Sequence, residues 1–191
     1  MLAKLIKEFS KIDRLPVEVS EVRDAIIKMG IQDEIIFCPD EKMDQKKLWG
    51  TYYQYTYRKT MYGDTSLVSL IIYCASLGVD WQRVVCCKEM IHVLDVGVEK
   101  TKTIDDLDGL VSRLLGPLST EDFGICDIMA AKDRIALYQA LPLLFPMEAR
   151  NDAVRKKISA EEVAKKALIP VGFASLMLTD KWPELVEDLT C

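Results

Sequence analysis

Two strand patterns in succession, at residues 51–57 and 66–74, constrain the fold of this chain most strongly. In the first, tyrosines alternate with other residues, so that three of them share one face, which is typical of a half-buried strand. The second is a more apolar run, and Gly63 and Asp64 mark a turn between the two. We therefore expect a hairpin, or two adjacent strands of a small sheet.

Helix patterns occupy much of the remaining chain, and together with the sheet they predict a single α+β domain. Asp80 is the expected N-cap of a helix at residues 81–95. A helix at residues 126–141 is expected to end at Pro142, because proline breaks the helical hydrogen-bond pattern. The other expected elements are helices at residues 1–11, 17–29, 104–115, 159–168 and 173–178, the last being the final helix, and a strand at residues 34–37 that ends at Pro39.

Composition excludes several classes of protein. The chain has 191 residues, 50% of them hydrophobic, which is enough for one buried core. A formal net charge of −5 argues against a general nucleic-acid surface. No apolar run approaches the roughly 20 residues of a membrane span, and charged residues interrupt the N-terminal segment, so we expect a soluble, cytoplasmic protein without a membrane partner.

The six cysteines are scattered and contain no C-x-x-C pair. Such spacing fits reduced, mostly buried thiols better than a disulfide framework. Cys86 and Cys87 are neighbours within the expected helix and are poor partners for each other.

The only histidine, His92, closes the string Lys88-Glu89-Met90-Ile91-His92. In a zinc-peptidase helix the pattern His-Glu-x-x-His places two imidazoles on one face, and its glutamate acts as general base toward the metal-bound water. Glu89 and His92 stand at the base and second-ligand positions, whereas Lys88 replaces the first ligand. A lysine ammonium has no lone pair for a metal at neutral pH.

A second motif runs from Asp133 to Pro146, with the sequence DRIALYQALPLLFP. Together with the Lys88–His92 string and the preceding strands, it resembles the ImmA/IrrE group of zincin-like metallopeptidases over about residues 48–178. In that group a pattern close to Glu-x-x-Ala-x-x-x-Ala-x-x-Leu-Leu-x-Pro carries the third zinc ligand, and Asp133 lands on that position. The resemblance implies a zincin-like core at residues 48–148, with residues 1–47 as a helical N-terminal segment of the same domain and residues 149–191 as a helical tail.

Three departures from the family pattern bear on the metal. Lys88 replaces a ligand, Asp133 is one methylene shorter than glutamate, and Pro142 falls inside the second motif. Asp95 shares the helical face of His92 and is the best local candidate for a replacement ligand. Without a metal, Lys88 can compensate the charges of Glu89 and Asp133, because neighbouring buried carboxylates need a positive charge or a proton.

These observations leave three functions open. The first is a catalytically inactive relative of zinc metallopeptidases that binds a protein or peptide partner in a bacterial or mobile-element regulatory setting, without a cofactor. The second is a zinc-dependent peptidase with Glu89 as base and His92, Asp133 and Asp95 as ligands. The third is a DNA-associated regulator using basic residues of the C-terminal helix pair, which acidic neighbours dilute. These basic residues are Arg150, Arg155, Lys156, Lys157, Lys165 and Lys166.

Overall fold

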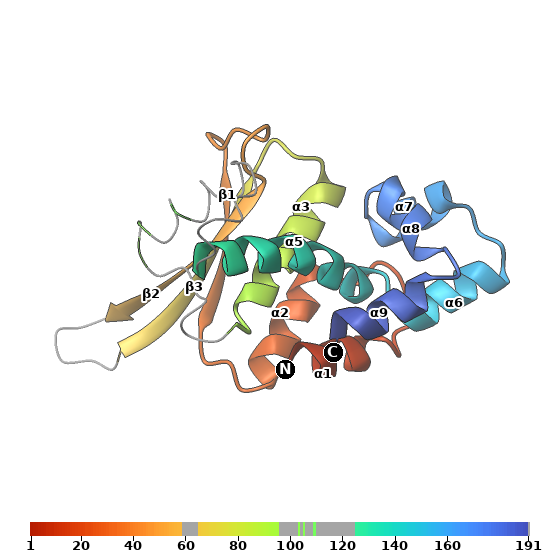
Figure 1. Ribbon diagram of the computed structural model, residues 1–191, viewed down its shortest axis with the longest axis horizontal. Helices are drawn as coiled ribbons and strands as arrows, with labels where there is room; N and C mark the ends of the chain where they lie inside the picture. The colour runs from red at the N-terminus through yellow and green to blue at the C-terminus, as the bar shows by residue number, and fades with distance from the viewer. Residues whose placement is uncertain (59–64, 96–102, 104, 106–108, 110–124, 191) are drawn as a thin grey trace.

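A three-stranded mixed sheet forms one end of the molecule (Figure 1). The computed structural model describes residues 1–58, 65–95, 103, 105, 109 and 125–190. Strand β3 (Thr65–Cys74) lies between β1 (Glu34–Asp40), which is parallel to it, and β2 (Gly50–Arg58), which is antiparallel. The expected adjacent strands are therefore confirmed, while the turn expected at residues 63–64 lies outside the described residues.

The prediction that the first strand ends at Pro39 was wrong. Strand β1 continues to Asp40, with Pro39 paired opposite Tyr73. Proline lacks a backbone donor, but it is tolerated on an edge strand, and β1 is an edge of the sheet that the structure describes.

Helix α3 (Val79–His92) lies across β2 and β3 and is the central element of the fold. Every residue from Arg83 to Ile91 is buried, so the helix is enclosed on all sides rather than along a single stripe. The predicted N-cap was wrong: Gly78 caps the helix, and Asp80 lies within its first turn, where a carboxylate is favoured by the positive end of the helix dipole.

Helix α5 (Ile125–Leu144) packs against α3 and contains Pro142. The prediction that this helix ends before Pro142 was therefore wrong. The three residues around the proline explain the outcome, since Leu141, Leu143 and Leu144 are fully buried and the bond from Phe145 N to Leu141 O, at 2.9 Å, continues the helical pattern. Burial of these leucines offsets the lost hydrogen bond.

The remaining helices complete one hydrophobic core that extends from Leu5 to Val186. In Figure 1, α6, α7 and α8 lie at the end of the molecule opposite the sheet, while α9 runs back toward α1, so the two chain termini lie near each other. The sequence prediction missed α6 and α9, so residues 173–178 do not form the final helix, and the helix expected at residues 104–115 falls almost entirely outside the described residues. The bounds are α1 (Leu2–Phe9), α2 (Val19–Lys28), α6 (Met147–Arg155), α7 (Ala160–Ala167), α8 (Val171–Met177) and α9 (Trp182–Thr190).

The architecture is thus α+β, with helices packed on a small mixed sheet. Within the described ranges, no helix is both long enough and apolar enough to cross a membrane.

Candidate functional site

Four charged side chains from two helices meet at the centre of the molecule. Lys88, Glu89 and His92 come from the C-terminal half of α3, and Asp133 comes from α5, which packs on it. We call these four residues the charge cluster. Because α3 and α5 are joined by a long segment, only tertiary packing brings Asp133 to the other three.

Lys88 is the hub of the charge cluster. Its Nζ lies 2.8 Å from Glu89 Oε1 and also forms an ion pair with Asp133 Oδ1. The Lys88 side chain is only 11% exposed. Burial alone would lower the pKa of Lys88, but the carboxylates of Glu89 and Asp133 outweigh it and hold the pKa above its ordinary value, so the ammonium is charged at neutral pH.

The two carboxylates differ in their electrostatic balance. Glu89 is 2% exposed, and this burial raises its pKa above the ordinary value despite the nearby Lys88. Burial also acts on Asp133, but contacts with His92 and Lys88 outweigh it and lower the pKa of Asp133. Asp133 is therefore the more firmly ionised of the two.

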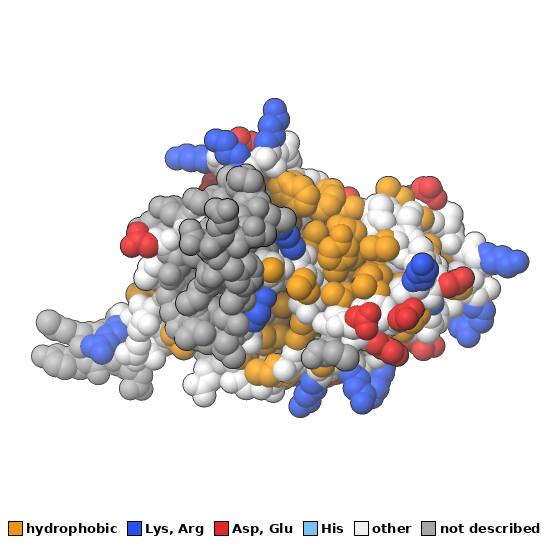
Figure 2. All heavy atoms as spheres, in the orientation of Figure 1, with side chains coloured by type: hydrophobic (Ala, Val, Ile, Leu, Met, Phe, Trp, Pro, Cys, Tyr) orange, Lys and Arg blue, Asp and Glu red, His pale blue; other side chains and the backbone are white. Residues whose placement is uncertain are grey.

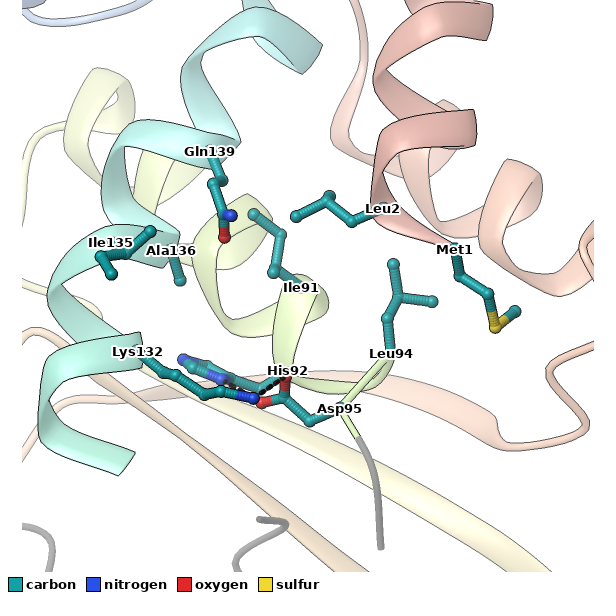
Figure 3. A pocket seen from close by; sticks show the side chains of 10 residues that line it. All are labelled: Met1, Leu2, Ile91, His92, Leu94, Asp95, Lys132, Ile135, Ala136 and Gln139. Carbon is teal, nitrogen blue, oxygen red and sulfur yellow. Dashed lines mark hydrogen bonds and ion pairs between the residues drawn. The ribbon is translucent and has the colours of Figure 1, made fainter. Parts of the chain in front are cut away.

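His92 is held on both sides of its ring. Its Nδ1 lies 2.8 Å from Asp95 Oδ2, and its Nε2 lies 3.5 Å from Asp133 Oδ1. Burial alone would lower the pKa of His92, whereas the carboxylates of Asp133 and Asp95 raise it to about 9. Figure 3 shows the side chain of Lys132 extending from α5 toward Asp95, and its Nζ lies 3.9 Å from Asp95 Oδ1.

The charges within the cluster balance when His92 is protonated. Two cations, Lys88 and the imidazolium, then face two carboxylates, Glu89 and Asp133. Asp95 in turn lies within ion-pair distance of Lys132. A buried ionic group without a compensating charge is costly, so this balance is the condition for keeping four such side chains inside the fold.

A metal would find three donors here but also a competing cation. One ligand atom each of Glu89, His92 and Asp133 lies within 4.8 Å of the others, and His92 Nε2 is buried without a hydrogen bond to any described residue. However, Lys88 Nζ already contacts the two carboxylate oxygens that would face the ion. With Lys88 charged, the residues present do not fit a zinc ion, because the ammonium would lie beside a second cation in a buried site.

The candidate residues from the sequence thus fall into two groups. Lys88, Glu89, His92 and Asp133 converge, and the structure shows that Asp133 reaches the cluster. Asp95 contacts Nδ1 of His92, whereas Nε2 faces Asp133. Asp95 therefore orients the imidazole from behind, in the manner of the outer carboxylates that fix histidine tautomers.

Two hollows flank the charge cluster. One, of about 310 Å³, is lined mainly by apolar residues and by His92, Asp95 and Lys132 (Figure 3). The other, of about 350 Å³, is lined by Lys88 and Asp133 together with residues before and at the start of β2. The cluster is thus accessible from two sides, although its side chains are largely buried.

Sequence reasoning missed two residues that shape the site. The ring of Tyr52 stacks on His92 with centroids 6.5 Å apart, and burial raises the pKa of Tyr52 above its ordinary value. Gly50 allows β2 to approach α3, since a Cβ there would lie 2.4 Å from Val85 Cγ1 and 3.3 Å from Glu89 Oε1. The alternation of residues 51–57 already placed Tyr52 on the face opposite Tyr53, but it could not say which helix covers that face.

The two adjacent cysteines and four of the six basic residues of the C-terminal helices have structural explanations. Burial raises the pKa of the Cys86 thiol to about 12, and it also raises the pKa of the Cys87 thiol. Neither cysteine is therefore a reactive thiol. Arg150 is buried and donates to the carbonyl oxygens of Met177 and Thr179 at 3.0 and 2.7 Å. On the C-terminal helices, Arg155 and Lys156 form ion pairs with Asp152, and Lys166 forms one with Glu162.

Comparison of the chain with protein-family models, with curated proteins and with solved structures gives no significant match.

Proposed function

We propose that this chain is a metal-free relative of the zinc metallopeptidases, in which Lys88 supplies the positive charge that a metal ion supplies in a peptidase. Such a protein does not hydrolyse peptides and acts by binding a protein or peptide partner. The proposal rests on the resemblance of the two motifs and on one observation above all, the simultaneous contact of Lys88 Nζ with Glu89 and Asp133.

The chemistry of the cluster supports an inactive site. Hydrolysis in a zinc peptidase needs a polarised water and a free carboxylate that removes its proton. Here the carboxylate of Glu89 is ion-paired with Lys88, so it is not free to act as a base toward water. Lys88 itself is held in the charged form and cannot accept a proton.

Reverting Lys88 to histidine tests this proposal. We expect the purified protein to hold no zinc at micromolar zinc, and we expect Lys88→His to bind zinc at least tenfold more tightly, since loss even of groups that only orient ligands weakens zinc sites 10- to 100-fold. Isothermal titration with zinc measures both. The double variant Lys88→His/Asp133→Asn is the control and should lose the gained affinity. One tightly held equivalent of zinc in the unchanged protein, or no gain in Lys88→His, would contradict the proposal.

A zinc peptidase with a nonstandard site is the second candidate. It is favoured by the close approach of donors from Glu89, His92 and Asp133, and by His92 Nε2, which lies 3.5 Å from Asp133 Oδ1 but forms no hydrogen bond with a described residue. This candidate requires Lys88 to leave its two partners before the ion binds. It predicts zinc-dependent peptide cleavage that disappears in Glu89→Gln, whereas the metal-free proposal predicts no cleavage by either protein.

A further inference from the structure

The hollow beside Lys88 has the features of a peptide-binding groove. It has a volume of about 350 Å³ and lies between the segment leading into β2 and the helices α3 and α5. Its apolar lining includes Leu48, Trp49 and Leu137, and its basic lining includes Lys46, Lys47 and Arg134. We call this hollow the basic groove. Figure 2 shows that apolar side chains gather over the middle of one face of the molecule, with basic side chains at their border.

Charge distinguishes this groove from the rest of the protein. Lys46, Lys47 and Arg134 are exposed, and none of them forms an ion pair with any residue that the structure describes. Asp133 is the acidic group in the lining, and Lys88 compensates it. The groove therefore carries an excess of positive charge on a chain whose formal net charge is −5. A local field of this kind attracts and orients acidic ligands.

Trp49 provides an apolar anchor that is already fixed in place. Trp49 is 42% exposed, yet its Nε1 donates to Gln45 O at 2.8 Å. Its ring also contacts Trp81 at a centroid distance of 4.7 Å, and Trp81 contacts Phe173 of α8 at 5.3 Å. A held aromatic side chain loses little conformational entropy on binding, and tryptophan is among the commonest centres of binding energy at interfaces.

We propose that the basic groove binds an acidic peptide segment carrying an apolar side chain, with the apolar side chain against Trp49 and the acidic groups against Lys46, Lys47 and Arg134. This inference deepens the proposed function, on which it rests, by naming the class of partner. The apolar and the basic lining residues together select the ligand. An apolar wall alone would accept many peptides, whereas the exposed cations reject basic peptides.

Three fluorescein-labelled nonapeptides test the inference by fluorescence anisotropy. The first has a central Leu-Phe pair flanked by glutamates, the second has lysines in place of the glutamates, and the third has serines in place of Leu-Phe. We expect the unchanged protein to bind the first at least tenfold more tightly than either of the others. We also expect this binding to weaken as salt is raised from 50 to 500 mM, because screening shortens the reach of exposed charges.

Single substitutions show where on the protein the acidic peptide binds. Arg134→Glu and Trp49→Ala should each weaken binding of the acidic peptide at least tenfold. Lys165→Glu reverses one exposed charge on α7, outside the groove, and should leave binding unchanged. Equal binding of the acidic and basic peptides, or equal losses in Arg134→Glu and Lys165→Glu, would overturn the inference.

The same samples separate this inference from the proposed function. Zinc content and mass spectrometry of the peptides after incubation report on metal-free inactivity. Intact peptides without binding would overturn the groove and leave the inactive site standing. Cleaved peptides would overturn the proposed function, while cleavage that Arg134→Glu abolishes would still support the groove.

Discussion

At the scale of single residues, Lys88 decides what the charge cluster can do. Glu89 and Asp133 approach each other inside the fold, and some positive charge has to accompany them. A protein-borne ammonium differs from a metal ion in two ways: it remains attached at any metal concentration, and it activates no water. The ion pairs of Lys88 with Glu89 and Asp133 therefore do not depend on the metal concentration.

Removing that ammonium should destabilise the fold. Lys88→Met leaves Glu89 and Asp133 without their shared cation, and we expect the free energy of unfolding to fall by about 3 kcal/mol at pH 7. The loss should shrink at lower pH as the carboxylates take up protons. Urea denaturation at pH 7 and pH 5 measures both effects.

Lys166→Met is the matched control for this change. Lys166 pairs with Glu162 on the surface of α7, where both side chains are about half exposed (51% and 54%). An exposed pair of this kind contributes less than about 1 kcal/mol. A similar loss in the two variants would show that burial of the charge cluster carries no special energetic weight.

His92 gives the protein a predictable pH dependence. Its folded-state pKa is raised to about 9 by Asp133 and Asp95 against the opposing effect of burial, from an ordinary value of 6.5. The stabilisation is thus fully present below pH 6.5 and is lost as pH rises through 9, for a total of about 3 kcal/mol. Denaturation of the unchanged protein and of His92→Gln across pH 6 to 10 should give curves that converge at high pH. Parallel curves would mean that His92 is not protonated in the folded state.

At the scale of elements, local patterns predicted the sheet and most helices, and tertiary packing determined the rest. The strand predicted at residues 66–74 was found at Thr65–Cys74, because a short continuous apolar run flanked by polar residues can adopt few secondary structures other than a buried strand. Pro142 misled the prediction, because buried leucines on both sides keep α5 helical. Helix α9 was not predicted, and Pro183 lies in its first turn, where proline is tolerated.

In the charge cluster, too, local sequence patterns predicted some of the contacts and tertiary packing determined the others. Lys88, Glu89 and His92 are near in sequence, so helix periodicity alone places them together. Asp133 lies 41 positions after His92, and only the family resemblance suggested that it joins them. No sequence pattern indicated the role of Gly50, which depends on how closely β2 approaches Val85 of α3.

That close approach can be tested directly. Gly50→Ala would place a Cβ 2.4 Å from Val85 Cγ1, so β2 and α3 would have to separate, and we expect a loss of about 1 to 3 kcal/mol in the free energy of unfolding. Gly172→Ala is the control, because no atom lies within 4 Å of the added Cβ and alanine favours the helix α8. We expect that variant to be unchanged or up to about 1 kcal/mol more stable in thermal or urea denaturation. Equal effects of the two substitutions would contradict the contact.

At the scale of the whole molecule, the two ends of the chain are joined through α9. This helix contacts both α1 and α5, and Gln139 Nε2 of α5 donates to Leu189 O at 2.8 Å. Trp182, at the start of α9, belongs to the same hydrophobic core as Leu5 of α1. Helix α5, which carries Asp133 of the charge cluster, is therefore supported by α9, and Figure 1 shows α9 running back toward α1.

Substitution of two tryptophans distinguishes residues that support the fold from residues that bind the peptide. Trp182 is 1% exposed, and Trp182→Ala should lower the free energy of unfolding by about 3 to 5 kcal/mol, because it removes a large side chain from the core. Trp49 is 42% exposed, and Trp49→Ala should cost less than about 1 kcal/mol while abolishing most binding of the acidic peptide. Urea denaturation and anisotropy on the same two variants measure both properties. If Trp49→Ala unfolds as readily as Trp182→Ala, then Trp49 is part of the structural core, and its loss of binding says nothing about a partner.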